Sequence, residues 1–261
     1  MVVCFDVDGV LVEVRESYHQ ALSETVSYFL QSPVKAETLL KLKVNLNLNN
    51  DWDATLAGIL FYRSGLSLEE FILLTSTGAP DFRKFYQLAE RRNIKLPDYD
   101  RVVEQFESTY RKLRFREKLK IPPEILRDIR QLARVMAVIT GRIKDDLHHT
   151  FEKHSLYQYF DYIITEDDLP SIDCRKPSAY PLRKLIETTG YSFPVCYIGD
   201  TLADRQMVDN YCQEEKKKAL FILFRNELNQ QVKADFYVDS PEALLETLKE
   251  VKRKFGSFDT Y

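Results

Sequence analysis

Short apolar runs that alternate with amphipathic stretches are the feature that most restricts the fold of this chain. The runs are rich in Val, Ile, Phe and Tyr and are too short for helices. Amphipathic segments such as 122–133 and 180–189 lie between them. Strands that alternate with helices predict a doubly wound parallel sheet, and runs that are apolar on both faces fit strands buried in it. The predicted strands are 2–5, 135–139, 160–164, 195–198, 219–224 and 236–238.

The first predicted strand stands apart, because more than a hundred residues separate it from the next one. Apolar residues recur at helical spacing through 15–30, and this predicts a helix there. We therefore expect an α/β core made of 1–12 and 122–261, with an α-helical cap domain inserted at 13–121. Further helices are predicted near 34–45, 51–63, 67–74, 81–92 and 99–117, with polar, Gly or Pro residues between them.

Composition excludes several classes of protein. The net charge is only −3 although 30% of the residues are charged, so the chain lacks the basic excess of a nucleic-acid-binding protein. The longest apolar runs are too short to cross a membrane, and the first residues lack a secretory signal. The four cysteines show no C-x-x-C spacing, as expected for free thiols in a reducing compartment. These features predict a cytoplasmic protein without nucleic-acid or membrane partners.

Carboxylates gather at the predicted carboxyl ends of the strands, where ligands bind in open α/β sheets. The first strand ends in D-V-D-G, with Asp6 and Asp8, and a later strand is followed by Asp200 and Asp204. On a strand, residues two apart share a face, so Asp6 and Asp8 are expected to point into one pocket. Several ionised carboxylates side by side need a counter-charge, and Mg²⁺ prefers such oxygen ligands.

Residues suited to binding phosphate accompany these acids. Lys176, in the loop before the helix at 180, supplies a compact positive charge. Thr140 and the backbone N–H of Gly141, after the strand 135–139, offer neutral donors to phosphate oxygens. This set matches phosphoryl transfer, which depends mostly on positioning and charge neutralisation. One aspartate would then be free to act as nucleophile and a second as general acid and base.

Four short motifs, in this order, resemble those of the haloacid dehalogenase (HAD) superfamily. They are D-V-D-G-V, V-I-T-G-R, R-K-P and G-D-T-L-A-D. The helical insert between the first two resembles the type-1 cap of subfamily I, which includes phosphoglycolate-phosphatase-like enzymes. The resemblance extends over the whole chain in architecture, but only about fifteen residues carry it. It implies a Mg²⁺-dependent phosphatase that acts on a small phosphorylated metabolite through an aspartyl-phosphate, since a type-1 cap admits small substrates.

The resemblance also implies a role for each residue of the four motifs. Asp6 would be the nucleophile, and Asp8 the general acid and base, whose backbone carbonyl helps to hold Mg²⁺. Asp200 would bind the metal, and Asp204 would support it directly, through water or through Lys176. In this scheme the metal residues are Asp6, Asp8, Asp200 and Asp204, and the phosphate-binding residues are Thr140, Gly141 and Lys176.

Several residues have two interpretations that the sequence leaves open. Arg142 either contacts an anionic substrate or lies on the surface. Asn50, Asp51 and Trp52, within the polar segment 45–55, either form a substrate-specificity patch or cap and pack a helix. Arg15, close to the junction with the cap, either contacts substrate or is solvated.

Other activities share these motifs. A phosphomutase has every residue named above, and a phosphonate hydrolase would need a desolvated cap lysine that the sequence does not mark. Dehalogenases of this type generally lack the second aspartate of the first motif, so Asp8 disfavours that activity. A non-catalytic metabolite-binding module on the same scaffold would be expected to have lost a catalytic residue, and none is lost. The sequence identifies neither the metabolite nor the oligomeric state.

Overall fold

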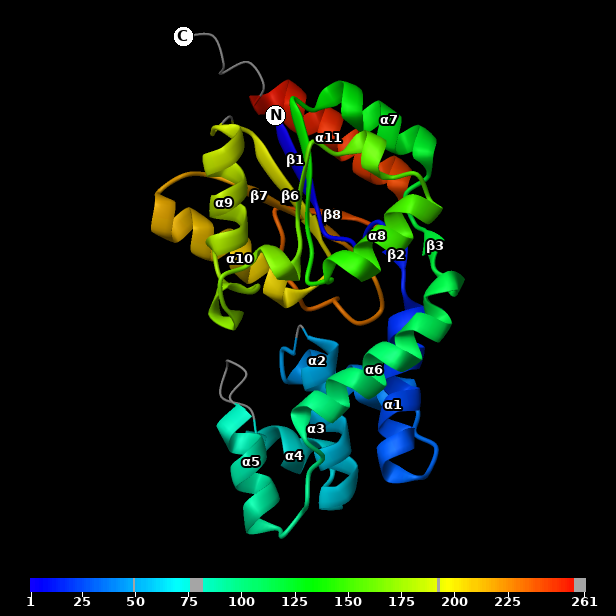
Figure 1. Cartoon of the computed structure of the whole chain (residues 1–261). Helices are drawn as coiled ribbons and strands as arrows, with labels where there is room; N and C mark the ends of the chain where they lie inside the picture. Colours follow the sequence, from blue (N-terminus) through cyan, green and yellow to red (C-terminus); the bar gives the residue numbers. More distant parts are fainter. Residues whose placement is uncertain (49, 76–81, 192, 256–261) are drawn as a thin grey trace. The chain divides into compact units, whose positions relative to one another are not determined.

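A computed structural model of the chain describes residues 1–48, 50–75, 82–191 and 193–255. The chain forms two compact units, one from Met1–Glu13 with Lys118–Tyr261 and the other from Val14–Glu117. Figure 1 shows the first as a sheet with helices and the second as a group of helices. The boundaries differ from the expected 13–121 by one and four residues. This is because β2 (Val12–Glu13) pairs antiparallel with β3 (Lys118–Leu119) in the first unit.

The α/β unit contains a six-stranded sheet in the order β5-β4-β1-β6-β7-β8. Every pairing in this sheet is parallel, so the expected doubly wound parallel sheet is confirmed. Its strands coincide with the predicted apolar runs to within two residues, and the four inner strands β4, β1, β6 and β7 are buried along almost their whole length. The strands are β1 (Val2–Phe5), β4 (Val135–Ile139), β5 (Tyr162–Ile164), β6 (Val195–Gly199), β7 (Leu220–Phe224) and β8 (Phe236–Val238).

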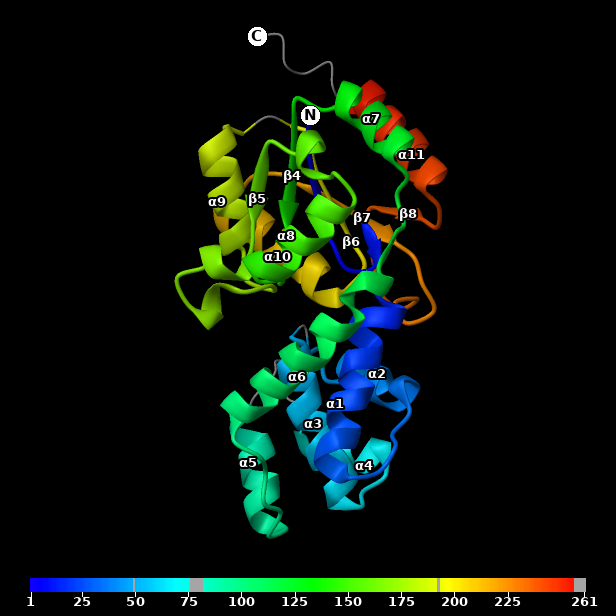
Figure 2. The ribbon, with the colours of Figure 1, turned by 45° about the vertical axis from the view of Figure 1, so that its right-hand side comes forward.

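Helices cover both faces of the sheet (Figures 1 and 2). On one face, α9 (Tyr180–Thr189) and α10 (Leu202–Glu215) pack on each other and on the central strands. Val2 and Cys4 of β1 point into this side of the core. On the other face, α7 (Pro123–Leu132) packs against α11 (Pro241–Phe255), and Figure 2 shows the two helices running side by side. The α8 helix (Lys144–Lys153) follows β4.

The position of β1 between β4 and β6 determines where a ligand can bind. The chain moves outward from β1 in one direction through β4 and β5, and in the other through β6, β7 and β8. The place where the strand order reverses direction is called the switch point of the sheet. The carboxyl ends of the strands at this point form the usual ligand crevice of an open α/β sheet. The ladder continues past the end of β1, because the Asp6 N–H donates to the Ile198 carbonyl at 2.8 Å. Asp6 is therefore held at the point where the two halves of the sheet diverge.

The second unit is helical in its described part. A π-helical turn at Arg15–His19 leads into α1, and aromatic rings of Tyr18, Phe106 and Tyr110 stack in the core of this unit. The helices lie close to the predicted segments because their apolar stripes face one another. They are α1 (Gln20–Leu30), α2 (Ala36–Asn45), α3 (Asp51–Ser64), α4 (Leu68–Thr75), α5 (Phe82–Arg91) and α6 (Tyr99–Leu113). Among all the described helices, none combines the length and apolar character needed to span a membrane.

Candidate active site

The carboxylate of Asp6 lies directly after β1 and is buried, with 7% of the residue exposed. Its Oδ1 atom accepts a hydrogen bond from the backbone N–H of Val7 at 2.8 Å and lies 3.0 Å from Lys176 Nζ. Burial raises the pKa of Asp6 from 3.8 to about 7, although the charge of Lys176 opposes this change. The site thus holds Asp6 in a fixed orientation but does not fully compensate its negative charge.

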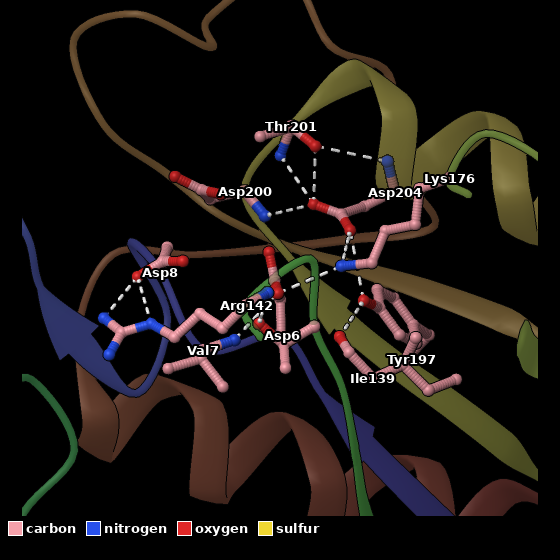
Figure 3. Close-up of polar contacts among 11 residues, drawn as sticks. Asp6, Val7, Asp8, Ile139, Arg142, Lys176, Tyr197, Asp200, Thr201 and Asp204 are labelled. Carbon is pink, nitrogen blue, oxygen red and sulfur yellow. Dashed lines mark hydrogen bonds and ion pairs between the residues drawn. The ribbon is translucent and has the colours of Figure 1, made fainter. Parts of the chain in front are cut away.

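Lys176 joins two of the acids (Figure 3). Its ammonium group lies 3.0 Å from Asp6 Oδ1 and 2.8 Å from Asp204 Oδ1, and it is also placed over the ring of Tyr197. Burial alone would lower the pKa of this lysine, but the carboxylates of Asp204 and Asp6 outweigh burial and raise the pKa. Lys176 therefore stays charged through the physiological range and can also neutralise an incoming anion.

Asp204, in the first turn of α10, is fully buried and accepts hydrogen bonds at both oxygens. Oδ1 accepts from Lys176, and the Tyr197 hydroxyl lies 3.1 Å from the same oxygen. Oδ2 accepts from the backbone N–H groups of Asp200 and Thr201 and from the Thr201 hydroxyl. Burial raises the pKa of Asp204, but Lys176 and the Thr201 donors outweigh it, so the pKa is lowered. Asp204 therefore completes the capping box with Thr201 at the start of α10 and also fixes Lys176.

Asp200 follows β6 and completes an acidic group with Asp6 and Asp204. One carboxylate oxygen from each of the three lies within 4.8 Å of the others. Burial raises the pKa of Asp200 well above its usual value, and the neighbouring Asp204 and Asp6 raise it further. Gly9 makes room for this residue, because a Cβ atom at position 9 would lie only 2.1 Å from Asp200 Oδ2. Gly9 also has a φ of +74°, a conformation that favours glycine.

These carboxylates fit a hard divalent cation. Burial, together with the neighbouring carboxylates, raises the pKa values of Asp6 and Asp200 even though Lys176 lies beside Asp6. A cation with oxygen ligands would offset the negative charge of these carboxylates. Asp204 already accepts hydrogen bonds at both oxygens, so Asp6 and Asp200 are the better placed ligands.

Asp8 lies apart from the acidic group and is bound by Arg142 (Figure 3). Both Nε and Nη2 of Arg142 donate to Asp8 Oδ1, at 3.0 and 2.5 Å. The strand ends at Phe5, and the chain turns through Val7, so the spacing rule that placed Asp6 and Asp8 on one strand face does not apply. The carboxylate of Asp8 is absent from the described acidic cluster that could hold a metal.

Arg142 is buried, so the surface interpretation of this residue is wrong. Only 3% of it is exposed, and its third guanidinium nitrogen, Nη1, donates to Thr150 Oγ1 at 2.7 Å. Its backbone N–H donates to Thr140 Oγ1 at 3.1 Å. Thr140 itself is buried at the end of β4, and Gly141 is exposed in the bend that follows. The motif after β4 thus links the threonine to Asp8 through one arginine.

The cap residues make contacts within the helical unit. Asn50 caps α3 by accepting from the N–H groups of Trp52 and Asp53, as its capping interpretation predicts. Asp51 pairs with Lys43 at 2.7 Å. The indole N–H of Trp52 donates to Glu107 at 2.8 Å. Of the segment 45–55, residue 49 lies outside the described residues. Arg15 is exposed in the first turn of the unit.

Sequence reasoning missed four residues at the site. Tyr197 was predicted only as part of a strand, and no sequence pattern around Lys120 indicates a role at the site. Two asparagines after β7 were also missed, although N-x-x-N one residue beyond a predicted strand is a turn pattern that can be recognised. The missed residues are Lys120, Tyr197, Asn226 and Asn229.

The family model for haloacid dehalogenase-like hydrolases matches residues 1–210. The chain belongs to this family. It is therefore a hydrolase of the haloacid dehalogenase type, and the resemblance inferred from the four motifs is confirmed. The match ends within α10, so the strands β7 and β8 and the loop between them lie beyond it.

Solved structures of phosphatases share the fold of this hydrolase. The phosphatase Tt82 from Thermococcus thioreducens aligns over 95% of this chain and 99% of its own, with a TM-score of 0.65 and 23% identity. A predicted phosphoglycolate phosphatase from Haemophilus somnus aligns over 94% and 96%, with a TM-score of 0.66 and 15% identity. At these identities the likeness shows the fold alone.

A longer curated protein is also similar in sequence. Imidazoleglycerol-phosphate dehydratase from Phytophthora nicotianae is 28% identical over 209 residues, which is 76% of this chain. The aligned part is only 39% of the length of that protein.

Proposed function

We propose that this hydrolase is a Mg²⁺-dependent phosphatase that cleaves a small phosphomonoester through an aspartyl-phosphate on Asp6. The observation that carries the proposal is the arrangement around Asp6. Its carboxylate lies after the central strand, 3.0 Å from the Lys176 ammonium and in the acidic group with Asp200. A nucleophile, a cation for the phosphoryl group and a set of oxygen ligands therefore occur together at the switch point of the sheet.

In the first step, a carboxylate oxygen of Asp6 attacks phosphorus, and the bond between phosphorus and the leaving oxygen breaks. Asp8 gives a proton to the leaving alcohol, so that a neutral product departs. Lys176 and the hydroxyl of Thr140 bind the phosphoryl oxygens. Lys176 is well placed for this role, because Asp204 holds its ammonium beside Asp6 at 2.8 Å.

In the second step, water attacks the aspartyl-phosphate. Asp8, now ionised, takes the proton of that water, and the bond between phosphorus and Asp6 breaks to release inorganic phosphate. Mg²⁺ would be held by Asp6, Asp200 and the backbone carbonyl of Asp8. When bound, it would neutralise negative charge on the phosphoryl group.

We propose the helical unit as a cap that limits the substrate to small metabolites and excludes water during the reaction. In this proposal, four residues of the unit bind the leaving group of the substrate: Asn50, Asp51, Trp52 and Arg15. The first three also stabilise the unit itself. Arg142 is a weaker candidate for substrate binding, because its guanidinium is bound to Asp8 and Thr150. All four cysteines are free, which supports a cytoplasmic location.

The substrate panel follows from the neighbours and the proposed chemistry. The panel contains small phosphomonoesters with different leaving groups, namely phosphoglycolate, sugar phosphates and nucleoside monophosphates. The name of the Phytophthora relative adds imidazoleglycerol phosphate, since the chain aligns with part of that protein.

The proposal is tested by phosphate release from this panel, with Mg²⁺ and with EDTA. Wild type should release phosphate only with Mg²⁺, and Asp6→Asn should be inactive. A matched control is Asp128→Asn, which changes an exposed carboxylate on α7 and should keep full activity. Turnover by Asp6→Asn, or turnover in EDTA, would refute the mechanism.

A phosphomutase is the alternative that shares the site most closely. Hydrolysis in ¹⁸O-labelled water should place one ¹⁸O atom in each phosphate released. A mutase would instead return the phosphoryl group to another hydroxyl of the substrate without uptake of label.

A further inference from the structure

We propose that Asn226 and Asn229, in the loop after β7, orient Asp200 as a metal ligand. This inference rests on the proposed function, because it assigns positioning residues to the Mg²⁺ site. Both asparagines lie beyond the residues matched by the family model. Nothing in the four family motifs points to them.

The loop contacts Asp200 at its side chain and at its main chain. Asn226 Nδ2 donates to Asp200 Oδ2 at 3.1 Å. Asn229 Nδ2 donates to the Asp200 carbonyl at 2.8 Å and also lies 2.9 Å from the Phe224 carbonyl. The Asp200 N–H is bound in turn to Asp204 Oδ2 at 3.2 Å. Asp200 is therefore fixed at its N–H, its carbonyl and one carboxylate oxygen.

The two asparagines also hold each other. The Asn226 N–H donates to Asn229 Oδ1 at 2.9 Å, and Asn226 Oδ1 accepts from the Leu228 N–H at 2.8 Å. This second bond closes a turn in which an asparagine side chain replaces a backbone acceptor. The orientation of the Asn229 amide follows from its partners, because a reversed amide would place oxygen against two carbonyl oxygens. Asn229 is 4% exposed, so its side-chain amide is shielded from water.

The backbone of Gly9 also lies against the same carboxylate. A Cβ at that position would overlap Asp200 Oδ2, so this oxygen lies close to both Gly9 and Asn226. Lys120 holds the backbone of Gly9 in place, since its Nζ donates to the Gly9 carbonyl at 2.6 Å and lies over the Phe224 ring at 4.2 Å. With Oδ2 fixed in this way, Oδ1 of Asp200 is the oxygen left to a metal.

An amide suits this position better than a charged side chain. It donates a hydrogen bond to Asp200 without adding a negative charge to a group of three acids. Partners of this kind, which orient a ligand without touching the metal, typically change metal affinity by about 10- to 100-fold when removed. We expect an effect of that size at Asn226.

The test measures Mg²⁺ binding directly, by isothermal titration calorimetry of the substrate-free protein. Asn226→Ala removes both side-chain contacts of Asn226. Asn226→Ser is the sharper variant, because its hydroxyl can still accept from the Leu228 N–H but is too short to reach Asp200. Both variants should bind Mg²⁺ about 10- to 100-fold more weakly. In phosphate-release assays, the Mg²⁺ concentration for half-maximal rate should rise by the same factor.

Gln231→Ala is the matched control, since Gln231 is exposed in the same loop and its side chain donates to the Leu228 carbonyl, at 3.4 Å. It should bind Mg²⁺ like wild type. A purely structural role for Asn226 would lower the melting temperature in EDTA but leave Mg²⁺ affinity unchanged, and this result would overturn the inference. Wild-type protein that binds no Mg²⁺ would overturn the metal site itself, and the inference with it.

Discussion

Replacing the buried Asp6 by asparagine should make the metal-free protein more stable at pH 8. In the folded protein, burial raises the pKa of this carboxyl from 3.8 to about 7. Below pH 3.8 both the folded and the unfolded chain hold the proton. Between that pH and about 7 only the folded chain keeps it, so the free energy of unfolding falls as the pH rises through this range. Above about pH 7 the carboxyl is ionised in both states, so the free energy of unfolding falls no further on its account.

The size of the effect follows from the change in pKa. A rise of about 3 units, at about 1.4 kcal/mol for each unit, corresponds to at most about 4 kcal/mol. Asparagine removes the charge and keeps an oxygen that can accept from Val7 and Lys176. We therefore expect Asp6→Asn to unfold with a free energy about 2 to 4 kcal/mol higher than wild type at pH 8. At pH 5 the difference should shrink to about 1 to 2 kcal/mol.

The assay must report on the α/β unit, because the single tryptophan of the chain, Trp52, lies in the helical unit. Cys4 and Cys196 are fully buried in the α/β unit and are suitable probes. Their labelling by a thiol reagent in increasing urea, followed by mass spectrometry, gives the free energy of unfolding at each pH in EDTA. Asp128→Asn serves again as the exposed control and should match wild type.

Mg²⁺ provides a second arm of the same experiment. A ligand at 100 times its Kd stabilises the folded state by about 2.7 kcal/mol. Saturating Mg²⁺ should therefore raise the free energy of unfolding of wild type and reduce its difference from that of Asp6→Asn. The variant lacks a carboxylate ligand and should gain less. Equal or lower stability of Asp6→Asn at pH 8 in EDTA would show that the ionised carboxylate is adequately compensated by Lys176, and the reasoning would fail.

Two further substitutions test the polar contacts of the site. Lys176→Met leaves the buried carboxylate of Asp204 without its cation, so the free energy of unfolding at pH 7 should fall by about 3 to 5 kcal/mol in urea titrations, and phosphatase activity should be lost. Stability within 1 kcal/mol of wild type would contradict that account. Arg142→Lys should loosen Asp8 and slow the hydrolysis of alkyl phosphates, whose poor leaving groups need a proton, far more than that of 4-nitrophenyl phosphate. An equal slowing of both substrates would indicate a structural role alone.

The sheet was predictable because its inner strands are buried on both faces. Each strand is a short apolar run, and the register of β1 with β4 and β6 needs no polar residue inside the ladder. Asp6, Asp200 and Asp204 could be placed together from sequence, because parallel strands bring their carboxyl ends to one edge. The carboxylate of Asp8 lies outside the cluster of these three acids, because the strand ends before this residue and the chain turns.

The contacts that orient the site could not be predicted. Arg142 and Asp8 are 134 residues apart, and Lys120 and Gly9 are 111 residues apart. Neither pair has a local pattern that favours it over other charged or polar residues. The asparagine turn after β7 is local and recognisable, but its contact with Asp200 depends on how β6 and β7 lie beside each other.

The central position of β1 also has a consequence for synthesis on the ribosome. Val2 pairs with Val135 and Val195, so β1 must wait for partners that are made much later. At about 5–20 residues per second, the delay is on the order of ten seconds. The helical unit, Val14–Glu117, is synthesised completely during that interval. Until β4 emerges, the apolar strand has both edges open to other chains, and the negative charge of Asp6 at its end would oppose such aggregation.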